Sequence, residues 1–304
     1  MQLLLTGATG FIGGGVARAA VTAGHQVTAL VRSASTDAAA RLADLGVHLR
    51  EGDLADTPLL AELAGSAAGV VHTASSNDEH AESLDENLVT ATLSAMAPGS
   101  GFVYTSGAWV YGDTGELPVT EDAELHPTRL VAWRPAMERR ALALAAQRSV
   151  AAVVLRPAMV HGHGGGVFAM LAQMGRHSGA VRIVGEGRNR WPTVHVDDLA
   201  VAYLRALDAA VARKPDVDGQ ILNVVAEQAV SVAEMAEAIR RAIGAEAVTP
   251  WPIRDARQDL GPFADALALD QCVDGDRAKH ALGWAPRQPD VITDLAAAIA
   301  AAAY

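Results

Sequence analysis

The sequence predicts an α/β fold with a doubly wound parallel sheet, and three observations support this prediction. Short β-branched or leucine-rich runs alternate with alanine-rich stretches throughout the first half, as in repeated βαβ units. A glycine-rich turn, Thr6 to Gly15, directly follows the first apolar run. The chain has 304 residues, which is long enough for one large α/β unit or for two closely joined lobes.

The expected elements alternate along the first half. Runs of β-branched and leucine residues predict strands at 2–6, 26–31, 47–50, 69–72, 102–106 and 151–156. The alanine-rich stretches between them predict helices at 11–23, 36–45, 58–63, 81–97 and 134–147. Proline is tolerated in a first helical turn, so Pro135 indicates that the last helix begins near Trp133 or is kinked.

The pattern becomes less regular after Arg156, and this change divides the chain into two expected parts. Residues 1–156 should form the sheet domain, and residues 157–304 should mainly form a smaller C-terminal lobe. The apolar run 221–225 predicts a further strand, and the segment near 193–225 is expected to return to the sheet.

The composition argues against several classes of protein. Hydrophobic residues make up 50% and charged residues 19% of the chain, which is inconsistent with a disordered protein. The net charge of −11 opposes binding to nucleic acid or to an anionic membrane surface. Cys272 is the single cysteine, so an intramolecular disulfide and a cysteine-based metal cluster are both excluded.

Membrane insertion and export are not indicated either. Arg148 and Arg156 interrupt the longest apolar candidate, residues 141–160. The first residues carry no basic region and no cleavage site of a signal peptide. We therefore expect a cytoplasmic protein whose partner is a small molecule, and the sequence leaves a homodimer open.

The turn TGATGFIGGG places Gly7, Gly10 and Gly13 directly after the first expected strand. Phosphate groups need backbone N–H groups at close range and a helix N-terminus aimed at their charge, and glycine lets the backbone come that near. Each glycine at the start of a helix costs about 1 kcal/mol relative to alanine. Because this chain uses alanine freely elsewhere, glycines that are kept here indicate a role that alanine cannot fill. The turn predicts a nicotinamide dinucleotide site; a tight turn without a ligand is the alternative.

The end of the second strand indicates which dinucleotide is bound. An acid there bonds the ribose hydroxyls, whereas an arginine accepts the 2′-phosphate of NADP. Here the strand ends in Arg32 and Ser33, and no acid appears before Asp37, so the sequence favours NADP(H), with NAD as the alternative. Asp53 has two interpretations: it accepts a hydrogen bond from the adenine amino group, or it caps a loop or helix.

Seven motifs follow one another in an order that resembles the extended short-chain dehydrogenase/reductase family, which includes NAD-dependent epimerases and dehydratases. They are TGATGFIG, GDL, VHTAS, FVYTSGAWVYG, RPAMVHG, VHVDDLA and LGWAP, and they span nearly all of the chain. The resemblance implies a Rossmann domain with a smaller C-terminal substrate lobe. Together with the turn and the strand end, it gives this set of expected cofactor contacts: Gly7, Thr9, Gly10, Phe11, Ile12, Gly13, Arg32, Ser33, Asp53, Leu54, Ala74, Ser75, Thr105, Pro157 and Val160.

The sequence departs from the family at the YxxxK dyad. In the family, the tyrosine exchanges a proton with the substrate, while the lysine lowers the tyrosine pKa and holds the ribose. Alignment of the helix before RPAMVHG puts Trp133 at the tyrosine position and Met137 at the lysine position. An indole does not titrate and a thioether carries no charge, so neither can do this chemistry. The chain looks like an atypical branch without the dyad.

Without the dyad, a proton donor near the nicotinamide would have to come from Ser106, Tyr111, His161 or His163. Ser106 and Gly107 occupy the region of the family's catalytic serine or threonine. His161 follows a strand end, and an imidazole is the side chain best suited to acid–base work near neutral pH, so we prefer it among the three candidate catalytic residues Ser106, Tyr111 and His161.

A metal site is not predicted. The histidines of HGHGGG have no cysteine or acid nearby at ligand spacing. The later group of His195, Asp197 and Asp198 looks similar, but we interpret Asp197 as the N-cap of a helix that begins near Asp198.

Three functions are compatible with these features. The first is an NADP(H)-dependent oxidoreductase acting on a carbonyl, an alcohol or an activated double bond, with Trp109, Trp133 and Trp191 as candidates for an apolar pocket. The second is an NADP(H)-binding regulator or pseudoenzyme. The third is a non-redox isomerase, dehydratase or cyclase with a structural or recycled cofactor.

Overall fold

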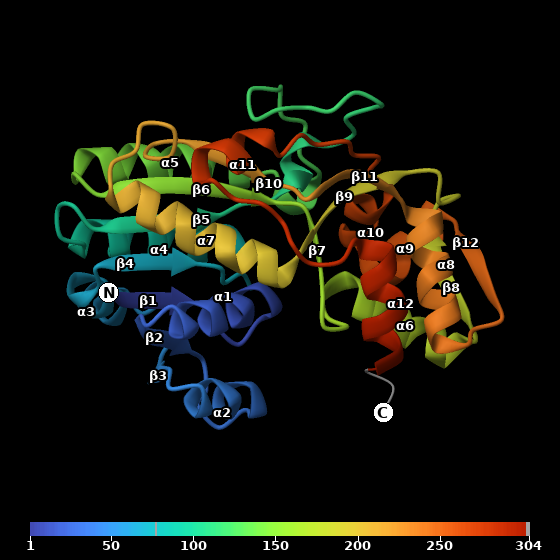
Figure 1. Ribbon diagram of the computed structural model, residues 1–304, viewed down its shortest axis with the longest axis horizontal. Coiled ribbons are helices and arrows are strands. Elements are labelled where there is room, and N and C mark those ends of the chain that lie inside the picture. The colour runs from blue at the N-terminus through green and yellow to red at the C-terminus, as the bar shows by residue number, and fades with distance from the viewer. Residues whose placement is uncertain (77, 302–304) are drawn as a thin grey trace.

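The first lobe is built on a seven-stranded parallel sheet (Figure 1). The computed structural model describes residues 1–76 and 78–301. The strand order is β3-β2-β1-β4-β5-β6-β10, so the chain leaves β1 in both directions, which confirms the doubly wound fold predicted from the sequence. The strands are β1 (Gln2–Thr6), β2 (Gln26–Val31), β3 (His48–Glu51), β4 (Gly69–His72), β5 (Gly101–Thr105), β6 (Ala151–Pro157) and β10 (Ile221–Val224).

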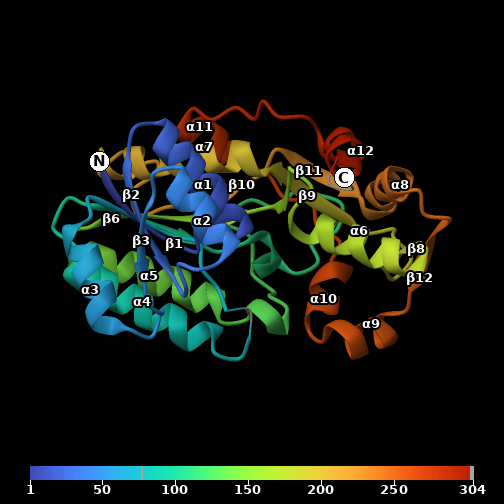
Figure 2. The ribbon, with the colours of Figure 1, turned by 90° about the horizontal axis from the view of Figure 1, so that it is seen from below.

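Helices cover both faces of this sheet (Figure 2). One face is covered by α1 (Phe11–Thr22), α7 (Val196–Val211) and α11 (Asp276–Leu282). The opposite face is covered by α3 (Thr57–Ser66), α4 (Ala81–Ala95) and α5 (Arg134–Gln147). The short helix α2 (Asp37–Asp44) precedes the edge strand β3.

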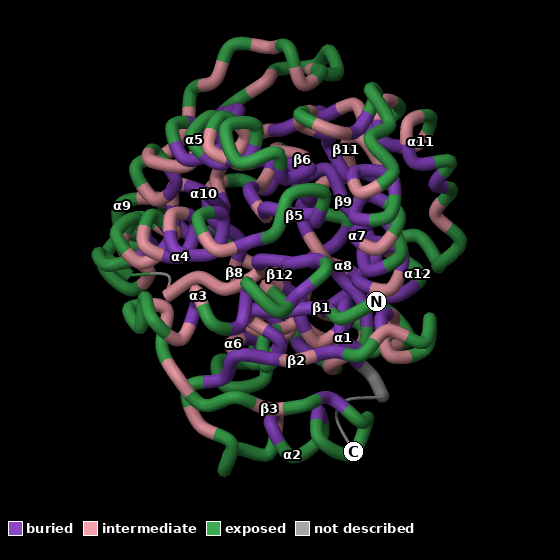
Figure 3. The backbone as a smooth tube through the Cα atoms, turned by 90° about the vertical axis from the view of Figure 1, so that its left-hand side faces the viewer, coloured by how far each residue is buried: buried purple, intermediate pink, exposed green. Residues whose placement is uncertain are grey.

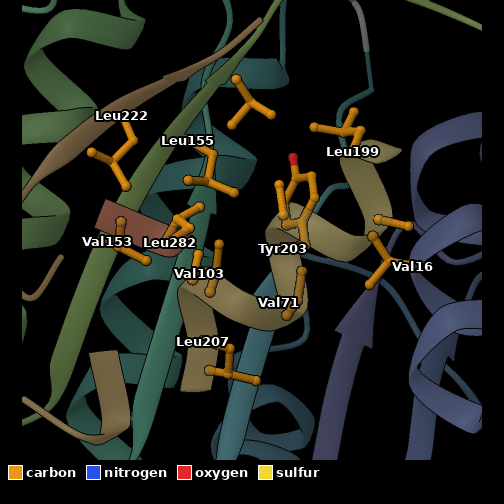
Figure 4. Packing of buried hydrophobic residues seen from close by; sticks show 14 of the residues in the cluster. Val16, Val71, Val103, Val153, Leu155, Leu199, Tyr203, Leu207, Leu222 and Leu282 are labelled. Carbon is orange, nitrogen blue, oxygen red and sulfur yellow. The ribbon is translucent and has the colours of Figure 1, made fainter. Parts of the chain in front are cut away.

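Hydrophobic packing fixes α7 against the sheet (Figure 4). Tyr203 and Leu207 of α7 belong to one cluster with Val71, Val103 and Val153 of three neighbouring strands, and none of these five residues is more than 1% exposed. Burying one such aliphatic side chain contributes about 1.5–3 kcal/mol. A parallel sheet needs apolar cover on both faces, and Figure 3 shows its strands as largely buried.

The second lobe packs its helices around two small sheets (Figure 1). Strands β7 (Met159–His161), β9 (Arg190–His195) and β11 (Glu227–Ser231) form one sheet, and β8 (Ala180–Val184) and β12 (Ala247–Trp251) form the other. Phe168, Trp191 and Trp251 are among the buried side chains of its core. The helices are α6 (Gly166–Ser178), α8 (Val232–Ile243), α9 (Ile253–Leu260), α10 (Phe263–Ala268) and α12 (Val291–Ala301).

The start of α7 differs from the sequence prediction, which made Asp197 the N-cap. The helix begins at Val196, because His195 still has extended backbone angles (φ −72°, ψ 140°) and acts as the cap. Its ring Nδ1 accepts a hydrogen bond from the Asp197 N–H at 3.1 Å. Asp197 and Asp198 lie in the first turn, where the positive end of the helix favours carboxylates.

Among the described residues, no helix combines the length and the apolar character that crossing a bilayer requires.

Candidate functional site

A cleft of about 1080 Å³ lies at the carboxyl ends of the central strands and is lined by both lobes. The first lobe contributes the turn after β1 and the ends of β2, β4 and β5. The second lobe contributes Val160, the start of α6 and Phe263. In a doubly wound sheet, ligands bind at this edge, where the strand order reverses.

The glycine turn has a shape that other residues would disrupt. Gly7 has a φ of +79°, and a Cβ there would lie 2.6 Å from the backbone nitrogen of Ala74. A Cβ on Gly13 would lie 2.1 Å from the carbonyl oxygen of Gly7. The N-cap of α1 is Gly10, which makes no side-chain cap, and the first turn contains no acid. Its N–H groups and positive dipole therefore face the cleft in the way that a dinucleotide phosphate requires.

The expected cofactor contacts gather in this cleft, with one exception. All of them line it apart from Ser33, whose hydroxyl lies 2.8 Å from that of Ser35. Arg32 is exposed at the cleft and bonds to none of the described residues. Asp53 also lines the cleft, and its Oδ1 accepts a hydrogen bond from the Ala55 N–H at 2.8 Å, so the geometry accommodates both interpretations of Asp53.

A buried polar network stands directly behind the turn. The hydroxyl of Thr6 lies 2.7 Å from Nδ1 of His72, and the other ring nitrogen lies 3.1 Å from Asp85. Tyr104 donates its hydroxyl proton to the second oxygen of Asp85 at 2.5 Å. Burial alone would raise the pKa of Asp85, but His72, Arg134 and these hydrogen bonds hold it below its ordinary value. The network ties β1, β4, β5 and α4 together beneath the cofactor turn.

Ser106 is the one of the three candidate catalytic residues that lines the cleft in the described part of the chain. It follows β5 and is 8% exposed. Its Oγ is buried and has no hydrogen-bond partner among the described residues. A buried hydroxyl without a partner costs free energy, so a ligand in the cleft that accepts its hydrogen bond would be stabilised.

Tyr111 and His161 are engaged elsewhere, and we do not retain either as the proton donor. Tyr111 donates to Oδ1 of Asn223 at 2.7 Å and accepts from Arg156 at 2.8 Å, and burial raises the pKa of Tyr111. His161 is 1% exposed, and its Nδ1 lies 2.9 Å from a carboxylate oxygen of Asp294. Neither side chain lines the cleft, because each is turned into a core.

The residues that replace the dyad lie differently from what the alignment suggests. Met137 is 5% exposed and belongs to the core between α5 and the sheet. Besides Arg32, Arg134 also reaches the cleft; it is the first residue of α5, and sequence reasoning missed it. An alignment three residues earlier places Leu130 and Arg134 at the YxxxK spacing, and this spacing is the signal that identifies Arg134. Neither alignment supplies a tyrosine.

A side pocket of about 160 Å³ adjoins the cleft beside Ser106. Its polar lining residues are Arg134, Asp78 and two serines. Its apolar walls include Trp109 and Trp133, as the sequence suggested, whereas Trp191 lies in the core of the second lobe, 6.1 Å from the ring of Phe168. The remaining apolar wall comes from Leu130, Val131 and Ala81.

Two groups of histidines and acids lie close enough to suggest a metal: His161 with His195 and Asp294, and His163 with His195 and Asp197. Both groups depend on His195. Its Nδ1 lone pair accepts the Asp197 N–H, so the neutral ring carries its proton on Nε2 and has no lone pair left for an ion. Burial and the neighbouring His161 lower the pKa of His195, which favours this neutral ring. The donor chemistry fits a hydrogen-bonded cluster better than a metal site.

Several proteins resemble this chain along most of its length. A Schizosaccharomyces pombe protein of uncharacterized function is 30% identical, and the match covers 97% of this chain and 98% of that protein. A UDP-glucose 4-epimerase of Corynebacterium glutamicum is 29% identical, covering 96% and 93%. A 2-alkyl-3-oxoalkanoate reductase of Stenotrophomonas maltophilia is 30% identical, covering 69% and 66%.

Solved structures share the fold. The UDP-glucose-4-epimerase of Stenotrophomonas maltophilia with bound NAD superposes with a TM-score of 0.80 at 22% identity, covering 100% of this chain and 99% of its own. A dTDP-glucose 4,6-dehydratase of Streptomyces venezuelae with NAD gives 0.81 at 20% identity, covering 98% and 96%. The profile of the NAD dependent epimerase/dehydratase family matches residues 3–224. This match spans well over half of the chain, so the protein belongs to the NAD dependent epimerase/dehydratase family.

Proposed function

We propose that this protein is an NADP(H)-dependent oxidoreductase that reduces a small, apolar organic carbonyl compound. The observation that carries this proposal is the distribution of charge in the cleft. Its charged or titratable lining residues in the described part of the chain all come from the first lobe: Arg32, Asp53, Asp78, His80 and Arg134. The second lobe lines it with Met159, Val160, Val167, Met170 and Phe263, together with Ala158 and Gly166.

This distribution disfavours a nucleotide sugar as the substrate. The diphosphate of such a molecule is best held by cationic side chains that form charge-assisted hydrogen bonds. Here the second lobe contributes only apolar residues to the described part of the cleft, so it offers no cation to a diphosphate. A carbonyl compound with an apolar chain suits the same surface, and one relative is named for the reduction of 2-alkyl-3-oxoalkanoates, whose chains are apolar.

The cofactor preference rests on Arg32. It is exposed at the end of β2, lines the cleft and has no acidic partner among the described residues. The acid that faces the end of β2 across the sheet is Glu51, and its carboxylate accepts the Ala34 N–H at 2.6 Å. A free guanidinium at this place supports recognition of a 2′-phosphate.

Ser106 is the residue we assign to the reacting oxygen. When bound, the reduced nicotinamide supplies a hydride to the carbonyl carbon. The Ser106 hydroxyl donates a hydrogen bond to the carbonyl oxygen and stabilises the negative charge that develops there. Water in the open cleft delivers the proton that completes the alcohol, since no tyrosine occupies the family position. Loss of one such donor typically lowers kcat by about 10²–10³.

The test is NADPH consumption with a panel of neutral aldehydes and ketones, measured by absorbance. The protein should oxidise NADPH with at least one apolar carbonyl compound, and Ser106→Ala should lower kcat/KM by about 10²-fold without changing NADPH affinity. Ser66→Ala, at the far end of α3, is the matched control and should behave as the wild type. Turnover of a UDP-sugar without net NADPH consumption would favour the epimerase function of the relatives instead. Binding of NADPH with no turnover of either kind would favour a regulator.

A further inference from the structure

Arg134 presents a fixed and unpaired guanidinium to the site. Its side chain is half-buried and lines both the cleft and the side pocket. NH1 donates to the carbonyl oxygen of Thr105 at 2.9 Å, and the guanidinium carbon lies 4.5 Å from the centre of the Trp133 ring. These two contacts hold the group in place. Nε and NH2 form no hydrogen bond within residues 1–76 and 78–301.

No carboxylate in the described part of the chain lies within 4 Å of this guanidinium. The charge of Arg134 helps to lower the pKa of Asp85, but both oxygens of Asp85 are already bonded to His72 and Tyr104. Asp78 lines the same two cavities, and its carboxylate is held by the Ser76 hydroxyl at 2.6 Å and the His80 N–H at 2.9 Å. A half-buried cation without a partner is costly, so an anionic ligand would be stabilised here.

Two further features point to an anion at the same place. The first turn of α5 contains no acid, and its N-cap Trp133 offers no side-chain acceptor, so the positive end of the helix is unopposed. Independently, the Oγ of Ser106 is more than nine-tenths buried, lines the same two cavities and has no partner among the described residues. Two donors that line the same side pocket of about 160 Å³, one of them charged, can therefore bind oxygen atoms of a ligand.

We propose that Arg134 and the first turn of α5 bind the carboxylate of the substrate, while Ser106 binds its carbonyl oxygen. The substrate class is then a 2-oxo or 3-oxo acid, because a pocket of about 160 Å³ that is lined by both donors favours a short spacing between the carboxylate and the carbonyl oxygen. The remainder of the molecule is an apolar group that packs against Trp109 and Trp133 and, toward the second lobe, against Phe263, whose ring centre lies 5.7 Å from that of Trp109. This inference rests on the proposed reductase function and adds the anionic head group to it.

A neutral ligand explains Arg134 less well. Ribose hydroxyls of the cofactor can accept hydrogen bonds from the guanidinium, but they leave its charge uncompensated. The two assignments differ in what a neutral substitution changes. A substrate anchor changes the affinity for carboxylates, whereas a cofactor anchor changes the affinity for NADPH.

The experiment is calorimetric titration of the NADP⁺-loaded protein with two probes of similar size, hexanoate and hexanamide. Wild type should bind hexanoate at least about tenfold more tightly than hexanamide. Arg134→Met should weaken hexanoate by about 10- to 150-fold, leave hexanamide unchanged and leave NADPH affinity within twofold. Arg134→Lys should restore part of the preference, and Arg139→Met, an exposed arginine on the same helix, should keep all of it.

Three outcomes would overturn the inference. They are equal affinity of the wild type for the two probes, no detectable binding of hexanoate, and a loss of NADPH affinity in Arg134→Met that matches the loss for hexanoate. The titration needs no turnover, so it tests the carboxylate site even where the NADPH assay finds no reduction. Conversely, reduction of neutral ketones together with failed hexanoate binding would retain the reductase and remove the oxo-acid specificity.

Discussion

The buried ion pair between Glu138 and Arg156 offers the sharpest test of how the cleft is held together. Glu138 lies on α5, four residues after Arg134, and Arg156 lies on β6, directly before the cleft residue Pro157. Two hydrogen bonds of 2.9 and 2.6 Å join the side chains, which are 1% and 2% exposed. Burial alone would lower the pKa of Arg156, but the bonds to Glu138 raise it, so the pair stays charged.

The expected cost of breaking this pair follows from its burial. Arg156→Met leaves the Glu138 carboxylate without its cation and also removes the bond to Tyr111. Removal of one partner of a buried pair costs about 3–5 kcal/mol, since the other charge stays desolvated. Proteins of ordinary stability unfold with only about 5–15 kcal/mol, so this is a large fraction. The exposed pair of Arg140 and Glu86, with a 3.1 Å contact and side chains 48% and 51% exposed, contributes about 0–1 kcal/mol.

Urea unfolding at pH 7, followed by circular dichroism, measures both changes under the same conditions. Arg156→Met should lower the free energy of unfolding by about 3–5 kcal/mol. Arg140→Met, on the helix that also carries Glu138, should lower it by less than about 1 kcal/mol. Glu138→Gln combined with Arg156→Met should recover part of the loss, because no unpaired charge then remains buried. Equal destabilisation by Arg156→Met and Arg140→Met would refute the reasoning.

Two further predictions concern the cofactor and pH. NADPH should bind at least about tenfold more tightly than NADH, and Arg32→Glu should abolish this preference. Fluorescence titration measures both affinities. Equal affinities of the wild type for the two cofactors would contradict the role of Arg32. The lowered pKa of Asp85 means that its stabilisation is complete above the unfolded value of about 3.9 and is lost as the pH falls through the lower folded value. Urea unfolding should therefore show a steeper loss of stability below about pH 4 in wild type than in Asp85→Asn; identical slopes would show that Asp85 is not a stabilising carboxylate.

The elements of the first lobe could be predicted because their signals are local. The apolar run 26–31 and the strand β2 coincide, as do the run 69–72 and β4, since a strand buried on both faces has to be continuously apolar. The boundaries were less accurate where a cap decides them. Helix α3 begins at Thr57 because the carboxylate of Asp56 accepts the Leu59 N–H at 3.0 Å, one residue before the expected start.

The site was predictable only where backbone shape makes it. Nearly all expected cofactor contacts line the cleft, since glycines at fixed spacing determine the turn. The preference for His161 had no such basis, because the partner that engages it, Asp294, lies 133 residues away in the sequence on α12. Arg134 was missed for the same kind of reason: its importance depends on an absent counter-charge, and the position of acids around it becomes visible only in three dimensions.

The two lobes differ in the kind of contact they offer, and this difference constrains how specificity can change. Every charged group that lines the described cleft comes from the first lobe, which also holds the cofactor turn. The second lobe meets the same space with side chains such as Met170 and Phe263. Dispersion contacts of this kind follow shape rather than charge, and methionine adapts to many shapes. Substitutions at these two residues should therefore alter which apolar group fits while leaving the anchoring of charge, and with it the reaction, to the first lobe.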